Sequence, residues 1–228
     1  MAIMHSLSQG LRRRQVDMIE DGICGSSKTL TRVTTKLRNV CNAGIKRLER
    51  RGQMRIGGRR AFVAIDESKF RHKRKYGRGR RGPTWRRRSW VFGMIEVKRS
   101  RRRPILKLVE NRSRERLLPI IEKYVRPGSK VISDSWRAYN NLSHNGYIHY
   151  QVNHHRHYVH PDTGAHTQHI ERAWRTYKEN VYRYRGNLTE KSLKMNLQFI
   201  EWNHWLAKDY RKGTLGRMFK DIRACYRM

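Results

Sequence analysis

The sequence predicts an α/β fold in which a mixed β-sheet is flanked by helices and preceded by a short helical N-terminal segment. Three patterns predict it. Residues 29–48 carry apolar side chains at helical spacing, five short apolar runs between residues 61 and 152 have the length of strands, and residues 166–181 and 191–206 form two amphipathic patterns. Because strands and helices alternate through the middle of the chain, a layered α/β arrangement is favoured.

The N-terminal segment, residues 1–52, is basic and predicted to be helical. Gly22 and Gly25 interrupt it, and Ser26-Ser27 supplies a plausible helix cap. This lead-in is either the end of a helix-turn-helix-like DNA reader or a helical segment that packs on the main domain, and we favour the second interpretation. A Gly/Arg linker is expected at 53–60, a main domain at 61–210 and a basic tail at 211–228.

The main domain reads as an ordered series of elements. Strands are predicted at 61–66, 90–97 and 104–109, a helix at 113–124, strands at 130–133 and 147–152, and then the two long helices. A short helix is expected between the last two strands. Strand, strand, strand, helix, strand, short helix, strand, helix is the order of the ribonuclease H-like fold, a mixed sheet flanked by helices.

The charge of the chain indicates a polyanionic partner. Lys and Arg number 53 and Asp and Glu 18, so the formal net charge is +35. Basic residues are spread over the whole length and interleaved with aromatic ones, which favours a folded nucleic-acid-binding surface over a disordered arm. The alternative, solvated basic faces without a partner, fits poorly with so large an excess.

A basic loop between the first two strands is the clearest candidate for DNA contact. We expect it to position phosphates, mostly without reading sequence, and expect Trp85 within it to stack against DNA. The residues concerned are Lys73, Arg74, Lys75, Arg78, Arg80 and Trp85. The other tryptophans are interpreted as core, with Trp90, Trp174 and Trp202 in apolar patterns.

Cysteine usage and hydropathy exclude several classes. The three cysteines are far apart and form no CxxC pair, so neither a disulfide framework nor a cysteine zinc ribbon is predicted, and a reducing intracellular setting fits. No apolar stretch approaches the length of a membrane-spanning helix, and no signal peptide is recognisable, so no membrane partner is expected.

Two acids end predicted strands that lie side by side in a ribonuclease H-like sheet. Asp66 closes the first strand and Asp134 the fourth. Single aspartates at such positions commonly cap the next helix, but two adjacent carboxylates repel each other unless a cation lies between them. Mg²⁺ or Mn²⁺ prefers oxygen ligands, and two such ions can support phosphodiester transfer. We therefore expect a two-metal site here.

A third acid should come from the long helix at 166–181. Glu171 is the best candidate, although alone it could be a surface ion-pair residue. Lys178 follows about two turns later on the same helical face and could contact a phosphate near the scissile bond. Glu67, next to Asp66, should point to the opposite face of its strand and is left out of the triad.

At these residues the chain resembles the Merlin superfamily of cut-and-paste DNA transposons and the related bacterial insertion-sequence transposases. The resemblance covers roughly residues 55–205. It is carried by ordered blocks: Ile65-Asp66-Glu67-Ser68, Arg74-Lys75-Tyr76 with Gly79-Arg80, Trp90-Val91-Phe92-Gly93, Ile132-Ser133-Asp134-Ser135-Trp136 with Ala138-Tyr139, Val152-Asn153-His154, and the HTQHIERAW block of residues 166–174 followed by Lys178.

The resemblance implies a DDE triad, divalent metal, strand cleavage and transfer of the 3′ end into target DNA. The family places 36 residues between the second acid and the glutamate, and the same 36 residues lie between Asp134 and Glu171. It also implies that His154 and His166 lie near the site and contact DNA. Such transposases pair two transposon ends, so a homodimer or larger assembly on DNA is expected, in the nucleus of a eukaryotic host or the cytoplasm or nucleoid of a bacterium.

Other interpretations remain at this stage. A histidine-rich stretch, with His154, His157 and His160 evenly spaced, suggests zinc, but His-only clusters lack the partners of most structural zinc sites. Many relatives carry an N-terminal zinc-binding segment that these cysteines cannot form, so we expect reduced recognition of transposon ends and a shortened start. A catalytically idle, domesticated DNA-binding protein and a ribonuclease H-fold nuclease are the two rival functions.

Overall fold

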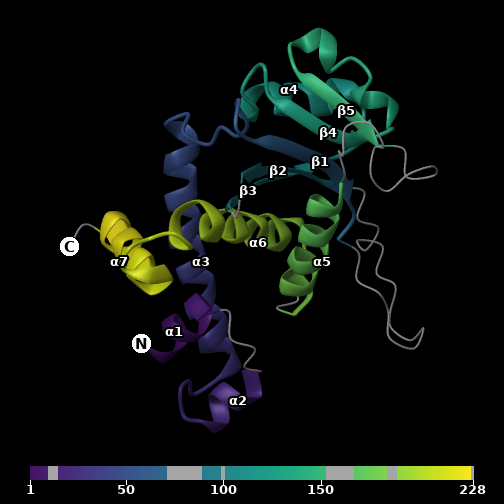
Figure 1. Ribbon diagram of the computed structural model, residues 1–228. Helices are drawn as coiled ribbons and strands as arrows, with labels where there is room; N and C mark the ends of the chain where they lie inside the picture. The colour runs from purple at the N-terminus through teal and green to yellow at the C-terminus, as the bar shows by residue number, and fades with distance from the viewer. Residues whose placement is uncertain (10–14, 71–88, 99–100, 153–166, 184–188, 227–228) are drawn as a thin grey trace, which may run out of the picture. The chain divides into compact units, whose positions relative to one another are not determined.

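The computed structural model describes the chain except residues 10–14, 71–88, 99–100, 153–166, 184–188 and 227–228 (Figure 1). The described residues form two compact units. One comprises residues 54–197, and the other combines residues 1–53 with residues 198–228. Each unit is described by itself below.

The unit of residues 54–197 is built on a five-stranded sheet. Its strands are β1 (Phe62–Ser68), β2 (Trp90–Lys98), β3 (Arg101–Val109), β4 (Lys130–Asp134) and β5 (Ile148–Val152). Their order across the sheet is β3-β2-β1-β4-β5 (Figure 1). This mixed sheet with flanking helices confirms the predicted ribonuclease H-like α/β fold.

Strand direction follows from the connections. β1, β2 and β3 pair antiparallel, whereas β1 pairs parallel with β4 and β4 pairs parallel with β5. A parallel pair needs a crossover, which the helix α4 (Arg114–Tyr124) supplies before β4 and two short 3₁₀ turns, η2 (Arg137–Tyr139) and η3 (Ser143–Asn145), supply before β5. β3 begins three residues earlier than the sequence predicts, because its arginine run continues the ladder with β2.

The helix α5 (Gln168–Arg183) packs against β1 and β2 (Figure 1). Its buried side chains recur every three or four residues and form one apolar stripe, and they are Ile170, Trp174, Tyr177 and Val181. This stripe fixes which face of α5 is turned toward the sheet. The polar residues of the helix, among them Glu171, then lie along its exposed side.

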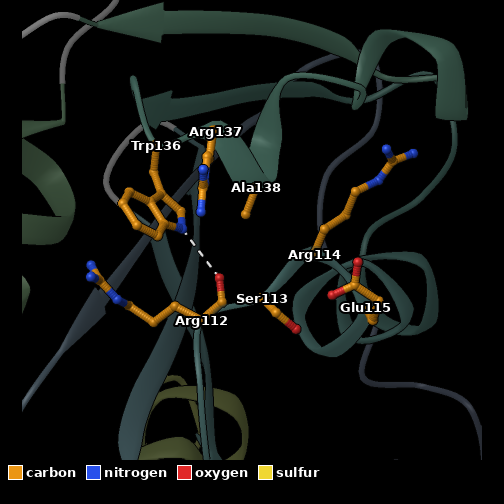
Figure 2. A pocket seen from close by; sticks show the side chains of 7 residues that line it. All are labelled: Arg112, Ser113, Arg114, Glu115, Trp136, Arg137 and Ala138. Atoms are coloured by element: carbon orange, nitrogen blue, oxygen red, sulfur yellow. Dashed lines mark hydrogen bonds between the residues drawn. The ribbon is translucent and has the colours of Figure 1, made fainter.

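The β3–α4 junction and the turn after β4 face each other on the sheet (Figure 2). The indole N–H of Trp136 donates to the backbone carbonyl of Arg112 over 3.1 Å, and this bond joins the two segments. Tyr139, at the end of the same turn, is fully buried. The chain leaving β4 is therefore held in place against the start of α4.

The expected linker packs into the unit of residues 54–197. Ile56 is fully buried, its N–H donates to the carbonyl of Tyr124 over 2.8 Å, and it forms a bridge with Val125. The buried side chain of Ile56 thus anchors residues 53–60 to this unit. The many glycines and arginines of the segment suggested a linker and gave no sign of this packing.

The other unit is helical. Its elements are α1 (Ala2–Gln9), α2 (Gln15–Glu20), α3 (Ser27–Arg50), the end of α6 (Glu190–Trp202), a π-helical turn η4 (Asn203–Ala207) and α7 (Gly213–Tyr226). Ser26 caps α3 by accepting from the N–H of Thr29 over 3.2 Å, as expected. The sequence predicted no helix at 213–226. Among the described helices, none is both long and apolar enough to cross a membrane.

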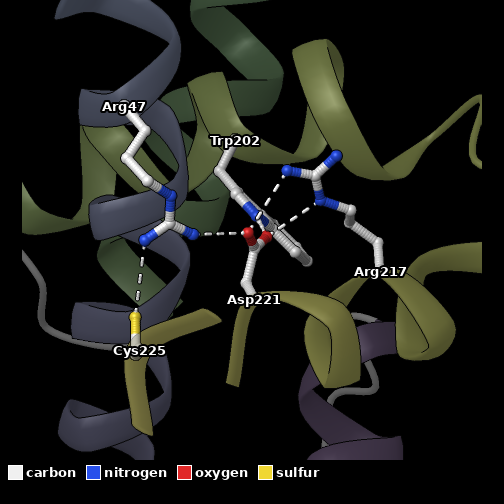
Figure 3. Close-up of polar contacts among 5 residues, drawn as sticks. All are labelled: Arg47, Trp202, Arg217, Asp221 and Cys225. Atoms are coloured by element: carbon white, nitrogen blue, oxygen red, sulfur yellow. Dashed lines mark hydrogen bonds and ion pairs between the residues drawn. The ribbon is translucent and has the colours of Figure 1, made fainter. Parts of the chain in front are cut away.

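A buried carboxylate joins the helices of this unit (Figure 3). Asp221 on α7 is 1% exposed and accepts from Arg47 on α3 at 2.9 Å, from Arg217 at 2.9 and 3.2 Å, and from the indole of Trp202 at 2.8 Å. A β-carbon at Gly44 would lie 2.8 Å from the same carboxylate, so only glycine lets α3 and α7 approach there. Two arginines therefore neutralise this acid.

We predict that Asp221→Asn destabilises the chain by about 3–5 kcal/mol, because it leaves two part-buried guanidinium groups without their shared counter-charge. Urea unfolding monitored by tryptophan fluorescence measures the change. Glu110→Gln breaks an ion pair whose side chains are 60% and 80% exposed, and should cost less than about 1 kcal/mol. Equal effects of the two substitutions would contradict the role given to Asp221.

Candidate functional site

Asp66 and Asp134 lie at the same level on neighbouring strands. The parallel pairing of β1 with β4 ends at Ala64 and Ile132, and each aspartate stands two residues beyond that pair. The expectation that Asp66 closes its strand is wrong, because β1 continues to Ser68 by pairing with β2. Asp66 instead marks the point at which β1 parts from β4, and Asp134 is the last residue of β4.

Two short hydrogen bonds hold the carboxylate of Asp66. The indole N–H of Trp174 donates to Oδ2 over 2.8 Å, and the backbone N–H of Glu67 donates to Oδ1 over 2.7 Å. Burial raises the pKa of Asp66 to about 6 against the lowering effect of these two bonds. The negative charges of Asp134 and Glu171 raise this pKa further.

Trp174 reaches Asp66 because β2 carries a glycine opposite it. Gly93 pairs with Asp66 in the ladder, and a β-carbon there would lie 2.4 and 2.5 Å from two atoms of the Trp174 ring. Phe70 meets the same ring edge-to-face, with centroids 5.9 Å apart. Trp174 was predicted to belong to the core, and it is indeed only 5% exposed. The N–H group of its indole, the one polar group of the side chain, donates to Asp66.

Asp134 and Glu171 are each held by a local contact. Asp134 is half-buried, and its Oδ1 accepts from the backbone N–H of Trp136 over 3.1 Å. Glu171 lies in the first turn of α5, where its Oε1 accepts from the hydroxyl of Thr167 over 2.7 Å. Thr167 is 3% exposed, so a buried hydroxyl orients an otherwise exposed glutamate.

Lys178 on α5 is close enough to Asp66 to be influenced by its charge. Burial lowers its pKa, while the charge of Asp66 raises it. The Nζ atom stands 5.9 Å from the ring centroid of Phe70, the residue that also packs on Trp174. The predicted lysine of α5 therefore shares its surroundings with Asp66.

Glu67 faces the other side of the sheet, as its position next to Asp66 requires. It is 8% exposed and accepts a short hydrogen bond from the hydroxyl of Tyr139. Burial raises its pKa to about 7 against the lowering effect of this bond, and the charges of Asp66 and Asp134 raise it further. We interpret Glu67 as a residue that supports the strand from the opposite face.

Asp66, Asp134 and Glu171 supply oxygen ligands, but their carboxylates are not gathered closely enough to surround a metal ion. Within the described residues, no three or more His, Cys, Asp or Glu side chains are grouped so that they could hold a metal ion. Three carboxylates are nevertheless the donor set that Mg²⁺ or Mn²⁺ prefers. A divalent cation would offset the repulsion that now raises the pKa of Asp66, and would favour a closer approach of the three acids.

Several expected site residues lie outside the described part of the chain. They are the basic-loop residues Lys73, Arg74, Lys75, Arg78, Arg80 and Trp85, and the histidines His154 and His166. Of the remaining histidines, the Nε2 of His149 lies 2.9 Å from the hydroxyl of Ser133, and the ring of His169 packs on Phe62 with centroids 5.5 Å apart.

The assignment of Trp90 to the core is wrong. Trp90 is half-buried, and two cations lie over its ring, Lys69 at 4.3 Å and Arg112 at 4.1 Å from the centroid. Its apolar neighbours in β2 suggested burial, but it is the first residue of β2, at the end of the strand where Lys69 and Arg112 lie over its ring.

Sequence reasoning also missed the supporting roles of four residues: Trp136 and Thr167, which bind acids close by in the sequence, and Gly93 and Trp174, which act across the fold. All four stand inside or next to the motif blocks. Thr167 and Glu171 are one helical turn apart, which is a recognisable signal, whereas the pairing of Gly93 with Trp174 becomes visible only in three dimensions.

We predict that Gly93→Ala displaces Trp174, breaks its bond to Asp66 and lowers stability by about 1–3 kcal/mol. Chemical unfolding measures the loss. Combining it with Trp174→Phe, whose smaller ring clears the added methyl group, should cost less than the two single changes together. Gly25→Ala, where no atom lies within 4 Å of the new carbon, is the control with little effect. If the stability losses of Gly93→Ala and Trp174→Phe simply added in the double variant, the proposed clash would be contradicted.

We also predict that Glu67 makes stability fall as pH rises. Its pKa is raised from 4.5 to about 7, so between these values the folded chain binds more protons than the unfolded chain, and this contribution is lost as pH increases. Glu67→Gln keeps an acceptor for Tyr139 but cannot titrate. Between pH 5 and pH 8, with a chelator present, wild type should lose roughly 2–3 kcal/mol relative to the variant. If the free energy of unfolding changed with pH in the same way for wild type and Glu67→Gln, this prediction would be wrong.

Comparison with known proteins places the chain in a family. The ISXO2-like transposase domain matches residues 53–202, well over half of the chain. An uncharacterized transposase-like protein of Haemophilus influenzae is 27% identical over 95 residues, 42% of this chain and 75% of that protein. A chain of the simian T-cell lymphotropic virus intasome in complex with PP2A regulatory subunit B56 gamma aligns with a TM-score of 0.41 and 16% identity, over 73% of this chain and 58% of that chain. The family match supports the insertion-sequence side of the resemblance seen in the sequence blocks, and the chain belongs to the ISXO2-like transposase domain family.

Proposed function

We propose that the chain is an active DNA transposase that cuts transposon ends and joins them to target DNA, with Asp66, Asp134 and Glu171 as its metal-binding triad. The observation that carries the proposal is the position of Asp66 and Asp134, side by side where two parallel strands part, with Glu171 acting on Asp66 from α5. The match to a transposase domain supports the same reaction class.

The electrostatic state of Asp66 favours a role in chemistry. Among the described residues it forms no ion pair, although the chain holds 53 lysines and arginines, and its pKa is raised to about 6. Burying a carboxylate in this way costs free energy that folding alone does not require. Perturbed acids of this kind concentrate at functional sites.

Asp66, Asp134 and Glu171 would hold the divalent metal, Mg²⁺ or Mn²⁺, as two ions. When bound, these ions lower the pKa of the attacking water or hydroxyl and stabilise negative charge on the leaving oxygen. Trp174 fixes Asp66, the Trp136 backbone fixes Asp134, and Thr167 fixes Glu171, so the protein orients all three carboxylates before substrate arrives.

The proposed reaction has two balanced steps. In the first, a water oxygen attacks a backbone phosphorus at the transposon end, the bond from phosphorus to the 3′ oxygen breaks, and a 3′-hydroxyl and a 5′-phosphate are released. In the second, that 3′-hydroxyl attacks a target phosphodiester and displaces a target 3′ oxygen. Each step exchanges one phosphorus–oxygen bond for another, so no external energy source is needed.

Lys178 and the basic residues of 71–88 would bind the DNA backbone in this scheme. Lys178 shares the surroundings of Asp66, so its ammonium group is placed to meet a phosphate close to the acids. Two transposon ends must be paired, so we propose a dimer or larger assembly on DNA. A relation to the Merlin superfamily is part of the proposal and rests on the sequence blocks that both groups share.

The deciding experiment is a cleavage and strand-transfer assay with DNA carrying the inverted repeats that flank the gene, in the presence of Mg²⁺ or Mn²⁺. We predict end cleavage and joining by the wild-type protein. Asp134→Asn should lower the rate by about two to three orders of magnitude, the loss typical when one electrostatic stabiliser is removed from an active site, and leave DNA affinity nearly unchanged.

The control is Glu110→Gln, which removes an exposed acid from the loop before α4 and should retain full activity. DNA binding without any cleavage by the wild type would favour the idle, domesticated DNA-binding protein. Cleavage without joining, on DNA that lacks the repeats, would favour a ribonuclease H-fold nuclease. Activity retained by Asp134→Asn would refute the assigned triad.

A further inference from the structure

A basic pocket lies on the unit of residues 54–197, between the β3–α4 junction and the turn after β4 (Figure 2). Its volume is about 470 Å³, and it is lined by Arg112, Ser113, Arg114, Glu115, Trp136, Arg137 and Ala138. Three arginines thus belong to its lining, and Figure 2 shows the guanidinium groups of Arg112 and Arg114 on opposite sides of the hollow, with that of Arg137 between them. None of these arginines was singled out by the sequence.

Arg112 is held rigidly by aromatic rings. Its guanidinium carbon lies 4.1 Å from the ring centroid of Trp90 and 4.3 Å from that of Trp136. Stacking of this kind keeps the planar group in one orientation. Figure 2 shows the guanidinium of Arg112 beside the indole of Trp136.

Trp136 links this pocket to the candidate metal site. Its indole N–H donates to the carbonyl of Arg112 over 3.1 Å, and its backbone N–H donates to Asp134 Oδ1 over 3.1 Å. The same residue therefore fixes one wall of the pocket and one carboxylate of the triad. A ligand that occupies the pocket sits beside the segment that positions Asp134.

The pocket carries an excess of positive charge. Among the described residues, Arg112, Arg114 and Arg137 form no ion pair, although the charge of Arg112 opposes the burial that raises the pKa of Glu67. The one acid in the lining, Glu115, is fully exposed, and its pKa is lowered by the hydroxyl of Ser113, which donates to it. One exposed carboxylate against three guanidinium groups favours an anionic ligand.

We propose that this pocket binds one backbone phosphate of the DNA substrate, separate from the phosphate that reacts at the triad. The proposal rests on the proposed function, since DNA bound at Asp134 would pass close to Trp136. Arg114 and Arg137 are exposed, so their side chains can turn in from the rim to meet the phosphate, while Arg112 adds a positive charge held in place by the rings of Trp90 and Trp136. The pocket would set the register of the duplex on the protein without reading its sequence.

The test measures binding alone, in the presence of a chelator, with a short duplex in which single phosphates are replaced one at a time by uncharged methylphosphonates. Arg137→Gln is exposed and should fold normally, and Arg114→Gln is the second variant. Each should weaken binding about three- to fivefold and lower the slope of log K against log salt by about 1. Neutralising one particular phosphate should abolish the difference between variant and wild type.

Arg116→Gln is the matched control, since Arg116 lies on the same helix as Arg114, is 60% exposed and does not line the pocket. For Arg116→Gln, neutralising any single phosphate should leave the difference in affinity from wild type unchanged. The proposal would be overturned if no single phosphate removed the difference for Arg137→Gln and Arg114→Gln, or if one removed it equally for Arg116→Gln. Inorganic phosphate should displace the duplex equally from wild type and Arg137→Gln; a selective effect on wild type would show a free-anion site instead.

This binding test and the cleavage assay fail independently. A protein that cleaves DNA but shows no coupling at the pocket would keep its proposed function and lose the phosphate site. A protein that shows coupling but never cleaves would keep the phosphate site and lose the enzymatic proposal.

Discussion

The hydrogen bond from Trp174 to Asp66 is the interaction on which the candidate site depends. It connects α5 to the middle of β1, and so brings the helix that carries Glu171 and Lys178 to the strand that carries Asp66. Gly93 makes room for it on β2, and Phe70 supports the ring from the side. The apolar stripe of α5 packs the helix on the sheet, and this hydrogen bond adds the polar contact that ties the helix to the carboxylate of Asp66.

Much of the fold could be predicted because strand and helix patterns are local. The element order and the fold class followed from apolar runs and helical spacing, and the cap at Ser26 followed from residue type. The end of β1 could not be placed correctly, because it depends on the pairing with β2, which lies far along the chain. The helix at 213–226 was missed because its apolar residues are interrupted by basic ones and its burial comes from α3, through Asp221.

The acids of the site were accessible to sequence reasoning, whereas their supports were not. Strand position selected Asp66 and Asp134, and the spacing shared with a family selected Glu171. Trp174 was assigned to the core, correctly, yet nothing in its pattern indicates that its indole N–H meets Asp66. Nothing in the sequence distinguishes Arg112 from the other arginines, because only the fold shows that its guanidinium group stacks on the rings of Trp90 and Trp136.

Two aspartates of this chain, Asp221, which is buried, and Asp66, which is half-buried, differ in a way that indicates their roles. Asp221 binds Arg47 and Arg217, so its charge is neutralised within the protein and serves to join helices. The donors to the carboxylate of Asp66 among the described residues are instead an indole and a backbone amide, and partial burial, with the charges of neighbouring acids, raises its pKa. In a chain with 53 basic residues, an arginine could easily have been placed beside it. An arginine there would compete with a metal ion for the same oxygens, so the lack of an ion pair at Asp66 within the described residues suits a carboxylate that binds a cation from solution.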